Sequence, residues 1–202
     1  MTRPTVDFWF EFASTYSYPA ALRIGPLARA AGIAVHWRPF LLGPIFAAQG
    51  WNSSPFNLYP VKGRYMWRDV ERICAGLGLT FRRPDPFPQS SLLPARVTLV
   101  GLEQGWGEEF VQRVYRAEFA DGRQIADRIV IADLLAGLGL DPEPVLARSQ
   151  SDDIKNRLRA ETDDAQRIGV FGAPSFTAGG ELFWGNDRLE AALDWAKDVV
   201  QP

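Results

Sequence analysis

Ser14, at the start of a predicted helix, is the first residue that could support chemistry. It follows a strand-like segment with an aromatic centre, Phe8-Trp9-Phe10-Glu11-Phe12, and precedes Thr15 and Tyr16. Unpaired amides and the positive end of a helix dipole favour an anion there, and a serine hydroxyl can donate one more hydrogen bond to it. A thiolate fits this position. An ordinary N-cap serine fits it equally well, so Ser14 needs a second observation.

The tripeptide Gly172-Ala173-Pro174 provides that observation. It stands immediately before two short strand-like segments. In a thioredoxin-type fold, such a proline is expected to be cis and to face the helix start, which directs the Ala173 backbone towards the site. The N–H and C=O groups of Ala173 can then pair like a strand with a bound peptide, and glutathione is such a peptide. A turn proline that ends a long helix is the alternative.

Two polar residues, Asn186 and Asp187, lie between the last strand-like segment and the last predicted helix. One of them is expected to cap that helix. The same geometry can hold the charged γ-glutamyl end of glutathione, and both roles are compatible. Asn52 and Lys62 bracket a long predicted loop and could offer the tripeptide an amide and a cation, although a lysine that begins a helix is most often solvated surface.

The sequence has one cysteine, Cys74, and one histidine, His36. A single cysteine excludes an internal disulfide and a Cys-x-x-Cys pair, so a disulfide oxidoreductase is excluded and any sulfur must come from outside the chain. With one histidine there is no metal cluster and no catalytic triad, and no metal is expected. Cys74 is expected to be a small core residue and His36 an ordinary strand residue.

The charge pattern also limits the partners. The 22 basic and 24 acidic residues are mixed along the chain and give a net charge of −2, which offers no surface for nucleic acid. No apolar stretch approaches membrane-spanning length, and the first residues lack the apolar region of a signal peptide. A cytoplasmic location is therefore expected.

The two ends of the chain predict one fold. Residues 6–12 read as a buried strand, 14–31 as a helix, and 33–38 as a strand that Pro39 closes, which implies parallel strands and a right-handed crossover. The C-terminal end reads as a hairpin around Gly179-Gly180 and then a helix, at 175–178, 181–184 and 188–200. A β-α-β start and a β-β-α finish together make an α/β protein of thioredoxin-like fold.

The middle of the chain is predicted to be helical. After a long loop at 43–60, which its length suggests is functional, helices are predicted at 62–77, 91–104, 108–120, 129–138, 142–148 and 151–168. We therefore expect an inserted all-helical domain, 43–166, in a thioredoxin-like domain made of 1–42 and 167–202. Five aromatic residues near the loop could line an aromatic substrate pocket or pack the two domains together: Phe40, Trp51, Phe56, Tyr65 and Trp67.

Five segments that span nearly the whole chain resemble one known family. In order, they are residues 10–18 (FEFASTYSY), 37–43 (WRPFLLG), 62–69 (KGRYMWRD), 169–174 (GVFGAP) and 181–188 (ELFWGNDR). They resemble 2-hydroxychromene-2-carboxylate isomerases, which belong with kappa-class glutathione transferases to the DsbA-like branch of the thioredoxin superfamily. One departure is Thr15, where the family usually has proline.

The resemblance implies roles for individual residues. Ser14 would contact the glutathione sulfur as a hydrogen-bond donor that lowers the thiol pKa, not as a covalent nucleophile. Binding of the tripeptide would fall to Ala173, Pro174, Asn186 and Asp187, and Asn52 and Lys62 match the family's loop and helix positions.

The reaction implied is glutathione-dependent cis–trans isomerisation. It would convert 2-hydroxychromene-2-carboxylate to trans-o-hydroxybenzylidenepyruvate, in aromatic hydrocarbon catabolism, by reversible addition of the thiolate and rotation of the adduct. Glutathione would be regenerated as a cofactor, and a homodimer is expected by analogy. Two alternatives stay open: a kappa-like transferase that conjugates glutathione to electrophiles, and a non-catalytic thiol- or peptide-binding module.

Overall fold

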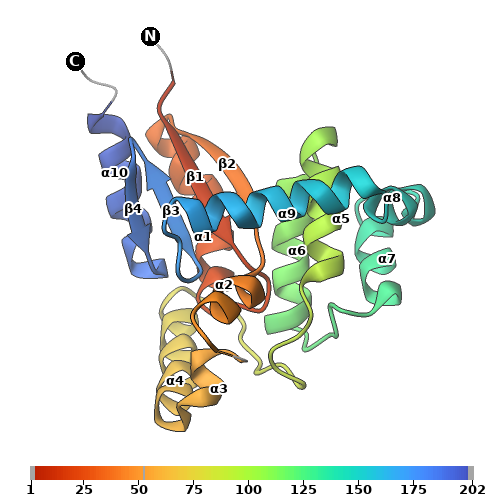
Figure 1. Cartoon of the computed structure of the whole chain (residues 1–202), viewed down its shortest axis with the longest axis horizontal. Coiled ribbons are helices and arrows are strands. Elements are labelled where there is room, and N and C mark those ends of the chain that lie inside the picture. Colours follow the sequence, from red (N-terminus) through yellow and green to blue (C-terminus); the bar gives the residue numbers. More distant parts are fainter. Residues whose placement is uncertain (1–2, 52, 200–202) are drawn as a thin grey trace.

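A four-stranded sheet forms the centre of the computed structural model, which describes residues 3–51 and 53–199. Its strands are β1 (Thr5–Phe10), β2 (Ala34–Pro39), β3 (Ser175–Ala178) and β4 (Glu181–Trp184), in the order β2-β1-β3-β4. β1 and β2 are parallel, and β3 is antiparallel to both β1 and β4. Both predicted halves of a thioredoxin-like fold are therefore present in one sheet (Figure 1).

Each half of the thioredoxin-like fold contains one helix. α1 (Ser17–Ala31) connects β1 to β2, and α10 (Leu189–Asp198) follows β4 after a 3-10 turn at Asn186–Arg188. α10 packs against β1, β3, β4 and α1. In the described part of the chain the other helices all lie between β2 and β3: α2 (Leu42–Ala48), α3 (Pro55–Leu58), α4 (Pro60–Gly76), α5 (Leu92–Gln104), α6 (Gly107–Phe119), α7 (Arg128–Ala136), α8 (Pro142–Ser149) and α9 (Asp152–Arg167).

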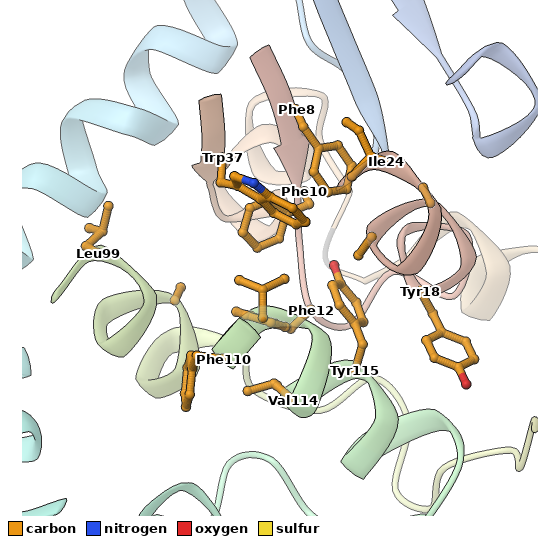
Figure 2. Packing of buried hydrophobic residues seen from close by; sticks show 14 of the residues in the cluster. Phe8, Phe10, Phe12, Tyr18, Ile24, Trp37, Leu99, Phe110, Val114 and Tyr115 are labelled. Atoms are coloured by element: carbon orange, nitrogen blue, oxygen red, sulfur yellow. The ribbon is translucent and has the colours of Figure 1, made fainter. Parts of the chain in front are cut away.

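The core runs without a break from the sheet into the helical middle. Phe8, Phe10 and Phe12 are fully buried, and the ring centroids of Phe10 and Phe12 lie 5.5 Å apart. The Phe12 ring in turn lies 5.1 Å from that of Tyr115 on α6. Figure 2 shows Phe8, Phe10, Phe12 and Tyr115 close together between the strands and α6. One hydrophobic cluster thus fixes the helices relative to the sheet.

A smaller cluster covers the opposite face of the sheet. Trp9, which points away from Phe8 and Phe10 because side chains alternate along a strand, packs with Phe40, Ile45, Ala165 and Val170. These residues come from β1, α2, α9 and the segments that flank them, and α9 runs across to the sheet from the helical group (Figure 1). The helical middle is therefore packed against both faces of the sheet, by the large cluster on one face and by the smaller cluster on the other.

Most predicted elements are confirmed with shifted ends. Both hairpin strands have the predicted bounds, and the six predicted middle helices correspond to α4 through α9. The last helix, predicted for 188–200, begins at Leu189, and residue 200 lies outside the described residues. The division into domains at 42/43 and 166/167 stays a prediction.

The loop prediction for 43–60 is wrong, because this segment contains α2 and α3. Pro55 occupies the first turn of α3, where a missing N–H costs nothing, and the Ser54 hydroxyl accepts the Phe56 N–H at 3.3 Å. Gly50, with φ of 78°, lies just after α2. The same residues that suggest a loop serve here as helix start and stop signals.

The predicted junction between the first strand and the first helix is also wrong in its limits. β1 ends at Phe10 instead of residue 12, and α1 begins at Ser17 instead of Ser14. Residues 11–16 form turns, in which the Ser14 N–H donates to the Glu11 carbonyl at 3.0 Å and the Ser17 N–H donates to the Ser14 carbonyl at 3.1 Å. These turns direct the chain from the sheet into α1.

The continuous core leads to a stability prediction. Phe12→Ala should lower the free energy of unfolding by about 3–5 kcal/mol, because it removes the ring that joins the sheet to α6. Urea titrations followed by circular dichroism and by tryptophan fluorescence should still give one coincident transition. Ile129→Ala, at a side chain that is 70% exposed on α7, is the control and should change stability little. A loss below about 1 kcal/mol for Phe12→Ala would contradict the account.

Candidate active site

Ser14 occupies the turn that leads into α1. Its side chain is 9% exposed, and its hydroxyl accepts the Ser17 N–H at 3.3 Å, which resembles the bond of a capping serine. The same hydroxyl donates to the Ala173 carbonyl at 2.8 Å. Ser14 is not the N-cap of α1, because that position belongs to Tyr16 and no side chain caps the helix. Its hydroxyl holds the turn before the helix and faces the proline segment. Its neighbour Thr15 is 2% exposed and lies in the same turn.

The segment before β3 meets Ser14 as predicted. The Ala173–Pro174 peptide bond is cis, as the sequence led us to expect. The Gly185 N–H donates to the Pro174 carbonyl at 2.9 Å, which continues the β3–β4 pairing and brings the end of β4 beside Ala173. The hairpin therefore places three segments together: the Ser14 turn, the Ala173 segment and the residues after β4.

A cleft of about 1170 Å³ lies between these three segments and α2 to α4. Of the residues predicted for the site, Ser14, Lys62, Ala173, Asn186 and Asp187 line it. Pro174 is not among the lining residues of the described chain, although its neighbour Ala173 is. Asn52, predicted as a contact, lies outside the described residues.

The residues after β4 differ from one another in their surroundings. Asn186 is 7% exposed, and its side-chain oxygen accepts a hydrogen bond from Arg23 of α1 at 3.2 Å. Asp187 is exposed and lies 3.1 Å from Arg188. Neither side chain caps α10, so that prediction is wrong: Asn186–Arg188 form a 3-10 turn, and the helix has no side-chain cap.

Aromatic side chains make up much of the cleft wall. Of the five that were predicted to line a pocket or pack the domains, Trp51, Phe56 and Tyr65 line the cleft. Phe40 and Trp67 pack elsewhere, Phe40 in the smaller core cluster and Trp67 against Phe87. Four aromatic wall residues were not identified from the sequence as pocket residues: Phe46, Phe87, Phe171 and Trp184. The rings of Phe171 and Trp184 lie 4.9 Å apart, and both side chains are about half exposed.

A tyrosine and an aspartate that line the cleft were also missed. The Tyr16 hydroxyl donates to Asp69 at 3.0 Å, and Asp69 also pairs with Arg72 at 3.1 Å. Burial and this hydrogen bond raise the pKa of Tyr16, so its hydroxyl stays protonated. The contact joins the Ser14 turn to α4, and no local sequence pattern indicates it because the two residues are 53 positions apart.

Glu11 is the buried acid of the cleft wall, with a side chain that is 7% exposed. Burial raises the pKa of Glu11 to about 7, although hydrogen bonds with the Ser91 side chain and the Ala13 backbone lower it. Behind it on α6, Glu118 is fully buried, and neither of its carboxyl oxygens has a hydrogen-bond partner among the described residues. Burial and the charge of Glu11 raise the pKa of Glu118 well above its ordinary value. An acid inside the aromatic run 8–12 was a signal that sequence reasoning could have used.

Cys74 and His36, the other two residues considered from the sequence, do not line the cleft. Cys74 is fully buried, and burial raises the pKa of its thiol to about 11, in keeping with a core residue. His36 lies on the edge strand β2, 3.1 Å from Asp7. Within residues 3–51 and 53–199, His, Cys, Asp and Glu side chains form no group of three that could hold a metal ion. The same residues include no helix with the length and apolar character needed to cross a membrane.

The fold and the site define the class of protein. Residues 5–195 match the family model of the DsbA-like thioredoxin domain. The chain therefore belongs to the DsbA-like thioredoxin family, which confirms the predicted fold class.

Individual relatives narrow the comparison. The chain is 31% identical to 2-hydroxychromene-2-carboxylate isomerase of Sphingobium xenophagum, over 92% of this chain and 94% of that protein. It is 26% identical to glutathione S-transferase kappa 1 of Homo sapiens, over 92% of this chain and 88% of that one. A solved structure of a 2-hydroxychromene-2-carboxylate isomerase superposes with a TM-score of 0.84 at 27% identity, over 94% of each chain. These findings confirm the predicted resemblance and support an isomerase-like enzyme.

The unpartnered acid on α6 gives a prediction for the pH dependence of stability. The pKa of Glu118 is higher in the folded protein than its ordinary value of 4.5, so stability is lost as pH rises above about 4.5. Glu118→Gln removes this loss, and its advantage in free energy of unfolding over the wild type should grow with pH, by at most about 1.4 kcal/mol per pH unit. Urea titrations at several pH values test this. Glu181→Gln, at an exposed position on β4, is the control. Parallel wild-type and Glu118→Gln curves would overturn the prediction.

Proposed function

We propose that the protein is a glutathione-dependent isomerase that converts 2-hydroxychromene-2-carboxylate to trans-o-hydroxybenzylidenepyruvate. One observation carries the proposal: the Ser14 hydroxyl lies 2.8 Å from the Ala173 carbonyl in the wall of a large, aromatic-lined cleft. In a chain with one cysteine, buried away from this site, a serine here cannot form a disulfide but can donate to a bound sulfur.

The residues of the cleft fit glutathione. Ala173 presents a backbone edge of the kind that binds an extended peptide, and Asp187 offers an exposed carboxylate for the amino group of the γ-glutamyl end. Asn186, held by Arg23, and the cation of Lys62 are further polar partners. Asn52 and Pro174 complete the set that the resemblance suggests.

The Ser14–Ala173 hydrogen bond also indicates how the peptide would be received. If Ser14 turns its proton to a sulfur, the Ala173 carbonyl becomes free to accept a peptide N–H. Each group would then exchange one partner for another, and no buried polar group would be left unpaired. The amides at the start of α1 add a positive potential at the same place, which favours a thiolate over a thiol.

Bound glutathione would supply a nucleophilic thiolate that adds reversibly to the conjugated carbon of the ring-opened substrate. Ser14 would hold that sulfur by a hydrogen bond and would not itself form a covalent bond. The aromatic wall, with Tyr65 and Trp184, would take the aromatic ring of the substrate.

A second candidate function is conjugation of glutathione to electrophiles. The similarity to kappa-class glutathione transferases supports it, because the same cleft residues would serve both reactions. The two functions differ in whether the thioether is released, so they are distinguished by the product.

The test of the proposal is an absorbance assay with purified protein and 2-hydroxychromene-2-carboxylate, with and without glutathione. Conversion should depend on glutathione, and Ser14→Ala should lower kcat/KM by roughly 10- to 100-fold, as expected when a hydrogen bond to a charged group is lost. Ser90→Ala, at an exposed serine outside the cleft lining, is the matched control and should be as active as wild type.

Two other outcomes would contradict the proposal. Accumulation of a stable thioether, detected by mass spectrometry, would favour the transferase. Absence of glutathione binding in calorimetry would favour a non-catalytic module and remove the role proposed for Ser14.

A further inference from the structure

Glu11 is buried and has no part in the roles assigned so far, yet it is one of the residues that line the proposed active site. Its backbone carbonyl accepts the Ser14 N–H at 3.0 Å, so Glu11 and Ser14 belong to the same turn. The Tyr115 hydroxyl donates to that carbonyl as well, at 2.9 Å. The turn that positions the proposed sulfur contact thus also fixes the backbone of an acid.

The surroundings of Glu11 keep it uncharged more easily than an ordinary carboxyl group. The side chain is buried, and its polar contacts are the Ser91 side chain and the Ala13 backbone. From α6 it is faced by two titratable groups, Tyr115 and Glu118, and the charge of Glu11 disfavours a second charge on Glu118. Glu118 therefore keeps its proton, and Glu11 is the member of the pair that titrates near neutrality.

The other titratable side chains of the cleft are Tyr16, Lys62, Tyr65, Asp69 and Asp187. Asp69 accepts a hydrogen bond from Tyr16 and pairs with Arg72, so its carboxylate is already engaged. Asp187 is exposed and pairs with Arg188. The pKa of Tyr16 is raised by burial and by the bond to Asp69. Among the described residues of the wall, Glu11 is thus the group best suited to exchange a proton near neutral pH.

We propose that Glu11 is the acid–base residue that opens the cyclic form of the substrate, an inference that rests on the proposed function. A 2-hydroxychromene-2-carboxylate carries a hydroxyl group and the ring oxygen on the same carbon, C2. Thiolate addition needs the open chain, in which C2 has become a ketone conjugated to the neighbouring double bond. Opening the ring moves one proton from the hydroxyl group to the ring oxygen.

Glu11 alone can carry this proton from the hydroxyl group to the ring oxygen. Its carboxylate takes the hydroxyl proton, and the electron pair of the O–H bond forms the C2=O double bond. The bond between C2 and the ring oxygen breaks, its electron pair stays on that oxygen, and the oxygen then takes the proton from the Glu11 carboxylic acid. The carboxylate is regenerated, nothing is oxidised or reduced, and Glu11 is available for the next substrate.

The experiment compares three variants of the glutathione-loaded enzyme. Glu11→Gln keeps the shape but carries no exchangeable acid proton, and it should lower kcat/KM by about 100-fold or more, the usual contribution of general acid–base catalysis. In the wild type kcat/KM should rise with pH through two ionisations, that of Glu11 and that of the glutathione thiol; the limb that belongs to Glu11 should be absent in Glu11→Gln, and the thiol limb should remain. Glu11→Asp keeps an acid in the same turn and should retain both limbs at a reduced rate.

Glu118→Gln is the matched control, because it replaces the neighbouring buried acid by a neutral group of the same shape. It should keep the wild-type rate and both wild-type pH limbs. Infrared difference spectra between wild type and Glu11→Gln give a readout that is independent of activity: the carboxylic acid band of Glu11 should disappear over the same pH interval as the limb that belongs to Glu11. Circular dichroism checks that each variant is folded.

The outcomes separate this inference from the proposed function. If the wild type converts the substrate and Glu11→Gln retains its rate and both pH limbs, or if Glu118→Gln loses the limb assigned to Glu11 instead, the role of Glu11 is wrong while the isomerase stands. If the wild type binds glutathione and does not convert the substrate, the isomerase proposal fails and the role of Glu11 fails with it.

Discussion

The hydrogen bond between the Ser14 hydroxyl and the Ala173 carbonyl joins two ends of a chain that are 159 residues apart in sequence. It can form only if β1 and β3 are neighbours in the sheet, as they are through the pairing of Trp9 with Ser175. It also requires that β1 ends early enough for the turn of residues 11–16 to reach the segment before β3. The position of the site therefore depends on the sheet order, which brings the Ser14 turn and the Ala173 segment together.

The helical middle has two structural tasks. Its core residues on α6 continue the aromatic stack of β1 and bury the turn that holds Ser14. Its first helices, α2 to α4, supply the opposite wall of the cleft, with Trp51, Phe56 and Lys62. A thioredoxin-like fold alone would leave Ser14 near the surface. The additional helices turn this position into a cavity that is large enough for a peptide and an aromatic substrate together.

Local sequence patterns predicted some features of the fold and the site and missed others. The hairpin around Gly179-Gly180 and the Ala173–Pro174 segment follow short-range rules, so their positions were predictable. The segment 43–60 was mistaken for a loop because proline and glycine signal both loops and helix ends, and only packing decides between them. The Tyr16–Asp69 contact and the Glu11–Glu118 pair depend on tertiary structure, which periodicity does not describe.

If glutathione is the cofactor of this protein, as we propose, the cleft holds its sulfur as a thiolate beside Ser14. The most direct measurement is the pKa of the thiol of protein-bound glutathione, obtained from the ultraviolet absorption of the thiolate as a function of pH. We expect the pKa of the bound thiol to be at least about one unit below that of a free thiol, which is about 8.5, and to return towards the free value in Ser14→Ala. A wild-type complex whose thiol titrates like free glutathione would contradict this expectation.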